Sequence, residues 1–158
     1  MKARLNYFQH NPDAFNKFGE VEAMIKNSSL DKKLIHLVKL RASQINNCTF
    51  CVDMHVKEAK IDGERDLRLH HLAAWEESPL FDDKEKAAFA WTEAVTKLNQ
   101  AHVSDDLYQK TREFFSEKEI VDLTLAVAMI NLWNRFGATF RSTPGSLDKI
   151  YGLDKAGL

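Results

Sequence analysis

Three side chains in one short segment have the chemistry for redox or acid–base work: Cys48, Cys51 and His55. The cysteines are three residues apart, and the histidine follows the second cysteine by four residues. If a helix begins at the Asn47–Cys48 step, both thiols lie in its first turn and the imidazole lies one turn further along the same face. Thiols at this spacing can form a disulfide with little backbone movement. The segment therefore predicts a row of two sulfur atoms and one base.

A thiol in the first turn of a helix is more acidic than an ordinary cysteine. A free thiol has a pKa of about 8.5, so only a few per cent of it is thiolate at neutral pH. A helix N-terminus favours an anion by about 0.3–2 kcal/mol, which lowers the pKa by at most about 1.5. Because this leaves the thiol only partly ionised, His55 is expected to take the remaining proton. A sulfenic acid formed on one sulfur can then condense with the other to a disulfide, so the pattern predicts a dithiol peroxidase or a disulfide exchanger.

Two other interpretations of the cysteine pair stay open at this point. The two thiolates and His55 are three potential zinc ligands, whereas a structural zinc site needs four. The nearest further histidines in the sequence are His70 and His71. Alternatively, both cysteines are buried packing residues, as free cysteines often are. A secreted disulfide framework is disfavoured, because it would use more cysteines at wider spacing.

The elements that position this row are predicted to be helices. The chain of 158 residues has only six glycines and three prolines, and so few chain breakers favour long helices. No stretch alternates between apolar and polar residues over a sustained length, so strands are not expected. The length suits one domain. We therefore expect an all-α, single-domain bundle of about six to eight helices over residues 1–158, with the CxxC motif at a helix N-terminus.

Apolar spacing and capping residues set the expected helix boundaries, which are about 12–26, 30–45, 48–60, 64–75, 83–99, 105–114 and 117–141. The Ser28-Ser29 pair is expected to cap the second helix. Ser116 and Glu119 have the spacing of a capping box at the start of the last one. That last helix is apolar on nearly all sides, so we expect it at the centre of the bundle or at a subunit interface.

Charge and hydropathy exclude several classes of function. Lysine plus arginine number 22 and aspartate plus glutamate number 23, and this balance argues against binding to a nucleic-acid backbone. No apolar run reaches 18 residues, so no membrane span is expected. The first residues are charged and carry no apolar run of the kind that a signal peptide needs. We expect a cytoplasmic protein.

The sequence around the cysteines adds specificity to the motif. The segment RASQINNCTFCVDMH, residues 41–55, closely resembles the alkylhydroperoxidase D-like branch of the carboxymuconolactone decarboxylase superfamily. The later segment INLWNR, residues 130–135, resembles the C-terminal helix of the same branch, and the likeness runs over roughly residues 10–142. The resemblance implies an all-helical subunit that assembles as trimers or hexamers. It also implies a peroxidatic role for Cys51, a resolving or proton-donating role for Cys48 and a proton relay through His55.

One position departs from the family pattern. The family places a glutamate twelve residues before the first cysteine, behind the imidazole of the relay, whereas this chain has His36 there. A histidine can pass a proton, but it cannot hold a negative charge, so we expect it to leave a cationic His55 without support and to repel it. The family's histidine between the cysteines is also absent, because Thr49 and Phe50 fill those places.

Together these features predict a cysteine-dependent hydroperoxide reductase that cycles a Cys48–Cys51 disulfide. The expected catalytic residues are Cys51, Cys48, His55 and His36, with no cofactor and no metal. The expected partners are a hydroperoxide substrate and a dithiol protein reductant, such as a thioredoxin-like protein or a lipoyl domain, with homo-oligomers but neither nucleic acid nor membrane. The alternatives are a protein disulfide exchanger or redox sensor, a decarboxylase-type enzyme of the same superfamily, and a non-catalytic oligomer with incidental cysteines.

Overall fold

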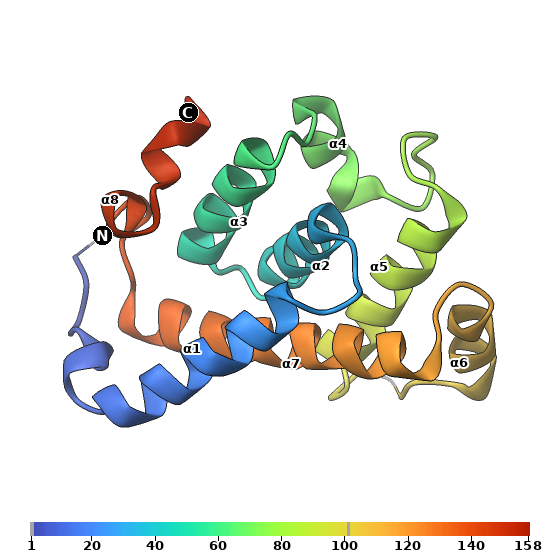
Figure 1. Cartoon of the computed structure of the whole chain (residues 1–158), viewed down its shortest axis with the longest axis horizontal. Coiled ribbons are helices and arrows are strands. Elements are labelled where there is room, and N and C mark those ends of the chain that lie inside the picture. The colour runs from blue at the N-terminus through green and yellow to red at the C-terminus, as the bar shows by residue number, and fades with distance from the viewer. Residues whose placement is uncertain (1, 101) are drawn as a thin grey trace.

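The structure, a computed structural model, describes residues 2–100 and 102–158, and every regular element in that part of the chain is a helix (Figure 1). The predicted all-α, single-domain fold is therefore confirmed. The α-helices are α1 (Pro12–Lys26), α2 (Lys32–Ile45), α3 (Thr49–Ile61), α4 (Asp66–His71), α5 (Asp83–Thr96), α6 (Asp105–Arg112), α7 (Glu117–Phe140) and α8 (Asp148–Tyr151). Three short 3₁₀ helices accompany them: η1 (Tyr7–Gln9), η2 (Leu72–Ala74) and η3 (Leu153–Ala156).

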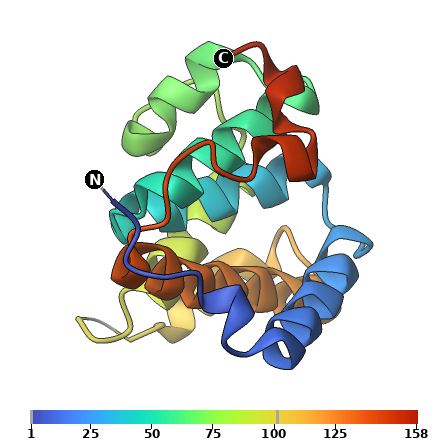
Figure 2. The same cartoon turned by 90° about the vertical axis from the view of Figure 1, so that its left-hand side faces the viewer.

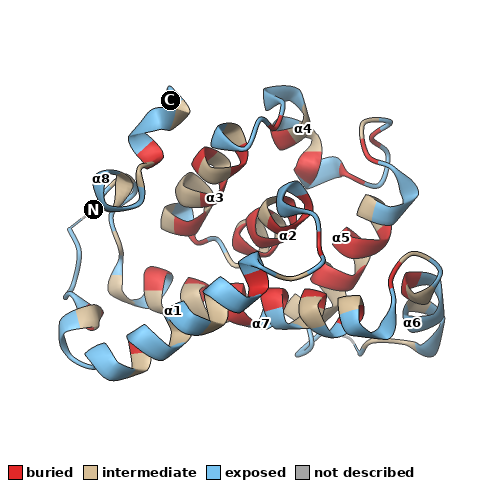
Figure 3. Cartoon of the chain, in the orientation of Figure 1, coloured by how far each residue is buried: buried red, intermediate tan, exposed pale blue. Residues whose placement is uncertain are grey.

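Helix α2 lies at the centre of the bundle, where it packs against α3, α5 and α7. The long α7 passes beneath it, and α1 crosses in front of α7 (Figure 1). Figure 3 shows the buried residues gathered on α2, α5 and the inner side of α7, while the outer faces of α1, α6 and α8 are exposed. Burial of apolar surface on these helices is the main force that holds the bundle together. Its largest enclosed side chains include Leu37, Leu40, Phe89, Phe115, Leu123 and Ile130.

Capping explains where two of the helices begin. At the start of α7, Ser116 and Glu119 form the predicted capping box, in which each side chain accepts from the other's backbone N–H. The expected serine cap of α2 is wrong, because Asp31 caps this helix by accepting from the backbone N–H of Leu34 at 3.1 Å. Ser28 instead accepts from the N–H of Leu30 and shapes the turn between α1 and α2.

The C-terminal part of the chain differs from the sequence-based expectation. The residues after α7 form α8 and η3, which are too short to leave a hydrophobic period in the sequence. Tertiary contacts hold them: Lys57 of α3 pairs with Asp148 at 2.8 Å, and Leu153 is buried. Figure 2 shows this segment running back along α3, while α1 lies below it against α7.

Helix α7 is buried on one side only. One side of α7 carries exposed apolar residues, Val121 and Leu125, so only its inner side is part of the core.

Among the residues that the structure describes, none belongs to a helix that is long and apolar enough to cross a membrane.

Candidate active site

The turn between α2 and α3 places the cysteine pair. Asn47 takes a left-handed backbone conformation, with φ of 53°, which asparagine tolerates better than most residues with a side chain. The amide of Asn46 donates to Asn131 and Asn134 of α7, each at 2.9 Å. The backbone N–H of Cys48 donates to the carbonyl of Ser43 at 3.0 Å. The turn is thus fixed to both neighbouring helices, and α3 starts directly after Cys48.

Cys48 and Cys51 form a disulfide across the first turn of α3, with Cα atoms 5.4 Å apart. Both residues are buried, at 1% and 3% exposure. They lie against Gly137 of α7, where a built Cβ would come within 2.8 Å of Cys48 Sγ and 3.4 Å of Cys51 Sγ. A glycine at this place lets the two helices approach closely, so α7 closes the disulfide on one side.

His55 lies one turn along α3 and is oriented by a carboxylate on the same helix. Its Nδ1 is 2.7 Å from Oε2 of Glu58, three residues further on. Because an ionised carboxylate only accepts, Nδ1–H donates to Glu58 and the Nε2 atom is left to take or give a proton. Burial raises the pKa of Glu58, but the nearby imidazoles of His36 and His55 outweigh it and hold that pKa well below its ordinary value. Glu58 is therefore ionised at neutral pH.

His36 lies on the other side of the same carboxylate. Its Nδ1 is 3.5 Å from Oε2 of Glu58, an ion-pair distance, and its Nε2 is 2.8 Å from Oδ2 of Asp62. Burial lowers the pKa of His36, but the carboxylates of Glu58 and Asp62 outweigh it and raise that pKa above its usual value of 6.5. Two imidazoles and two carboxylates thus alternate from His55 to Asp62.

The structure brings together all four residues that the sequence singled out, and adds one. Cys51, His55 and His36 line the same pocket, and Cys48 lies behind it in the disulfide. The expected repulsion of His55 by His36 is wrong as stated, because Glu58 lies between the two rings and supplies a negative charge. Sequence reasoning missed Glu58, although its three-residue spacing from His55 was a usable signal for a shared helix face.

Other polar residues near the motif have structural roles. Arg41 of α2 binds Glu93 of α5 through its Nε at 2.8 Å, and the indole N–H of Trp75 donates to the same carboxylate. Asn134 donates to Ser43 Oγ at 3.0 Å, which ties α7 to α2. These contacts stabilise the frame around the site and do not reach into the pocket.

A set of possible metal ligands exists in the described part of the chain. His36, His55 and Glu58 each offer one ligand atom, and these atoms lie within 4.8 Å of one another. Three ligands fall short of the four that a closed structural zinc site uses. His70 and His71 do not belong to this set, and His71 instead faces Ser78 at 3.0 Å.

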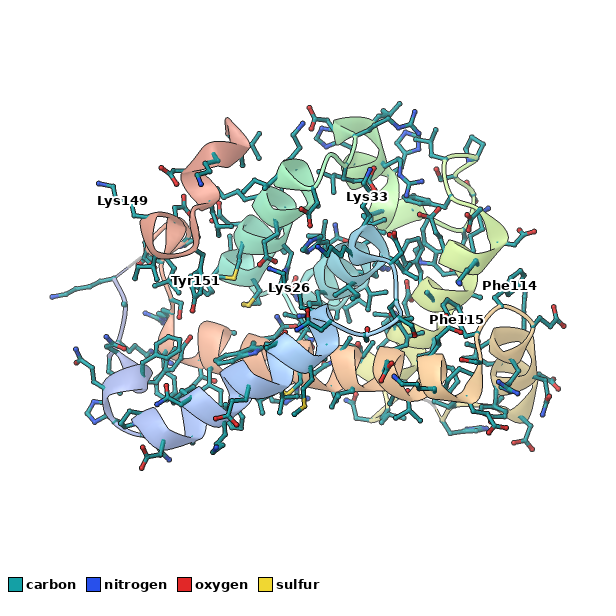
Figure 4. All side chains as sticks on the ribbon, viewed as in Figure 1. Lys26, Lys33, Phe114, Phe115, Lys149 and Tyr151 are labelled. Atoms are coloured by element: carbon teal, nitrogen blue, oxygen red, sulfur yellow. A yellow bond between two sulfur atoms is a disulfide. The ribbon has the colours of Figure 1, made fainter. Side chains whose placement is uncertain are left out.

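A pocket of about 360 Å³ opens beside Cys51. Its walls come from η1, α1, α2, α3, α7 and the C-terminal segment, and Figure 4 labels two of the lining side chains, Lys26 and Tyr151. Cys48 is not among the lining residues. The disulfide therefore presents one sulfur-bearing residue to the pocket and hides the other behind it.

Comparison with known proteins places these features in a family. A model of the carboxymuconolactone decarboxylase family matches residues 11–94, which include α2, α3 and both cysteines. The uncharacterised protein YdfG of Bacillus subtilis is 37% identical over 135 residues, which cover 85% of this chain and 92% of YdfG.

Solved structures give the same result at the level of the fold. A protein of unknown function from Agrobacterium tumefaciens, for which an AhpD antioxidant-defence role is suggested, is 43% identical with a TM-score of 0.87 and covers 90% of this chain and 98% of its own. The debrominase Bmp8 is 18% identical with a TM-score of 0.79, and the match covers 94% of this chain and 80% of Bmp8. At that low identity the likeness to Bmp8 concerns the fold alone.

Proposed function

We propose that this chain, which belongs to the alkylhydroperoxidase D-like branch of the carboxymuconolactone decarboxylase family, is a cysteine-dependent hydroperoxide reductase. Its fold and family support antioxidant-type or related enzyme activity, and the finer assignment rests on the site. The single observation that carries it is the unequal access of the two sulfur residues: Cys51 lines the pocket, whereas Cys48 is enclosed by α7.

The proposed reaction begins with the reduced protein and uses both cysteines. The Cys51 thiolate attacks the distal oxygen of the hydroperoxide, the O–O bond breaks, and the alcohol or water leaves after taking a proton. The sulfur is thereby oxidised to a sulfenic acid. Cys48 then attacks that sulfur, an S–S bond forms, and water leaves. One peroxide has gained two electrons and the dithiol has lost two.

In this proposal His55 moves the proton and Glu58 orients His55. The hydrogen bond from Nδ1 to Glu58 leaves Nε2 free to accept the Cys51 proton and to return it to the leaving oxygen. The charge of Glu58 stabilises the imidazolium formed in between. His36 and Asp62 are positioning residues: His36 holds Glu58 through an ionic contact, and Asp62 holds His36 in turn.

An external dithiol is needed to reduce the disulfide again. Because both sulfur residues are nearly fully buried, we propose that the reductant reaches Cys51 through the pocket. A dithiol on a flexible arm, as in a lipoyl domain, fits this access better than the flatter surface of a thioredoxin-like protein. Such a cycle requires a reducing compartment such as the cytoplasm. Assembly as a trimer or hexamer remains part of the proposal.

Rapid mixing of the reduced protein with a hydroperoxide, followed by mass spectrometry, tests the proposal. The wild type is expected to consume one peroxide per chain and to gain a Cys48–Cys51 disulfide. Cys51→Ser should lose the reaction, whereas Cys48→Ser should complete one turnover and then over-oxidise at Cys51.

The opposite pattern would overturn the assignment of roles. Full steady-state turnover by Cys51→Ser would exclude Cys51 as the attacking thiol. Reaction of the wild type with peroxide no faster than that of a free thiol of matched pKa would instead favour a disulfide exchanger acting on protein partners.

A further inference from the structure

The pocket beside Cys51 is far larger than a hydrogen peroxide molecule needs. Its volume of about 360 Å³ is more than ten times the roughly 30 Å³ that one water molecule occupies in the liquid. It also lies within the roughly 300–1,000 Å³ of pockets that hold small organic ligands. Side chains with aromatic rings line it from five elements, η1, α1, α3, α7 and α8: Tyr7, Phe8, Phe15, Phe50, Trp133 and Tyr151.

The enclosed part of the wall favours an uncharged ligand, since the two further lysines of the lining, Lys26 and Lys32, are exposed to solvent. Lys39 lines the pocket and is buried, but its ammonium group pairs with Glu22. Glu22 also accepts from the indole N–H of Trp133 at 2.9 Å, so both charges have partners within the wall. An anionic ligand would have to compete with Glu22 for Lys39, whereas an aromatic ring can stack on the neighbouring side chains.

One residue of the α1 wall leaves open space. Gly19 lies in the interior of α1, is exposed and lines the pocket, so a built Cβ would meet nothing within 4 Å. Its φ is not positive, so neither the backbone conformation nor a close neighbour requires a glycine. Alanine is more favourable than glycine inside a helix. What glycine contributes at this position is width at the mouth of the pocket, between Phe15 one turn before it and Ala23 one turn after it.

We propose that Gly19 determines substrate specificity by keeping the pocket wide enough for a bulky aryl group. This inference rests on the proposed function. The wide pocket makes uncharged arylalkyl hydroperoxides the preferred substrates over hydrogen peroxide. The aryl group stacks in the aromatic wall and the peroxide group faces Cys51. The chemical step is the one given above, in which the aryl alcohol leaves.

Steady-state kinetics with cumene hydroperoxide and hydrogen peroxide test this. We expect the wild type to favour cumene hydroperoxide in kcat/KM by at least tenfold. Gly19→Leu should lower that preference at least tenfold, and Gly19→Ala should lower it less, because the effect follows the added volume. Lys17→Leu is the matched control: it places the same side chain two residues before Gly19, on the opposite, exposed face of α1 and outside the pocket lining, and it should keep the wild-type preference.

A binding measurement separates the pocket from the chemistry. The oxidised protein, which cannot turn over, is titrated with cumyl alcohol while the Trp133 resonances are followed by NMR. Binding of cumyl alcohol by the wild type, and binding at least tenfold weaker by Gly19→Leu, support the proposed role of Gly19. If both are observed but no peroxide is reduced, the proposed function is wrong while the role of Gly19 in shaping the pocket still holds. An unchanged peroxide preference in Gly19→Leu, or an equal loss for both peroxides, overturns it.

Discussion

The two sides of the disulfide are built differently, and two glycines mark the difference. On the side of α7, Gly137 lies so close that a built Cβ would come within 2.8 Å of Cys48 Sγ. On the side of α1, the pocket separates the sulfur atoms from Gly19, where a built Cβ would meet nothing within 4 Å. Both residues lie inside helices, where glycine costs about 0.5–1 kcal/mol relative to alanine. The first glycine permits contact between helices, and the second preserves space.

Because of this difference, the disulfide is held firmly on one side and faces the pocket on the other. Asn46, Asn131 and Asn134 fix the cysteine turn to α7, and the tight contact at Gly137 holds Cys48 in place. On the α1 side, Cys51 faces the pocket. Identical substitutions on the two sides should therefore have opposite effects on stability.

The largest effect is expected for Gly137→Ala. The new methyl group overlaps Cys48 Sγ, and overpacking of this kind typically costs about 1–3 kcal/mol. The gain in helix propensity of about 1 kcal/mol offsets only part of it. We expect a net loss of up to about 2 kcal/mol, measured by urea denaturation of the oxidised protein at a fixed protein concentration. A gain of about 1 kcal/mol, the full difference in helix propensity, would mean that α7 shifts at no cost and that the close contact does not require glycine.

A smaller, pH-dependent effect is expected for His36→Gln, on the pocket side. The raised pKa of His36 means that its ionic contacts stabilise the fold fully below about pH 6.5 and that this stabilisation is lost as the pH rises through the raised value. Glu58 stays ionised over this range because its pKa is lowered. The stability difference between wild type and variant should therefore be about 1 kcal/mol larger at pH 5.5 than at pH 9.

Denaturation curves at the two pH values measure this difference. His10→Gln changes an exposed histidine and serves as the control, for which no such change with pH is expected. A gap between wild type and His36→Gln that stays constant with pH would show that the His36 charge does not interact with Glu58 and Asp62 in the folded protein.

The smallest effect is expected for Gly19→Ala, which completes the comparison. The added methyl group meets open space, so only the backbone preference changes. We expect a gain of about 0.5–1 kcal/mol, visible as a rise in Tm of a few degrees for a chain of this length. A loss of stability instead would show that α1 closes over the pocket in solution and that the two sides are more alike than the structure indicates.

The sequence by itself determined the helical fold and the row of reactive side chains. Helix period and caps are local properties, so α1, α3 and α7 could be located to within a few residues, and the spacing of Cys48, Cys51 and His55 fixes them on one helix face. The same local reasoning could have found Glu58, which follows His55 on that face. Elements without a hydrophobic period, such as α8, could not be found in this way.

Only the tertiary structure decided which sulfur is accessible and where the charges meet. Cys48 and Cys51 are equivalent in the sequence motif, and they differ only because α7 packs against one side of the disulfide while α1 stands away from the other. The position of Glu58 between His36 and His55 likewise depends on how α2 packs on α3. Such contacts join residues far apart in the chain, and their geometry follows from the packing of whole helices, which local spacing does not encode.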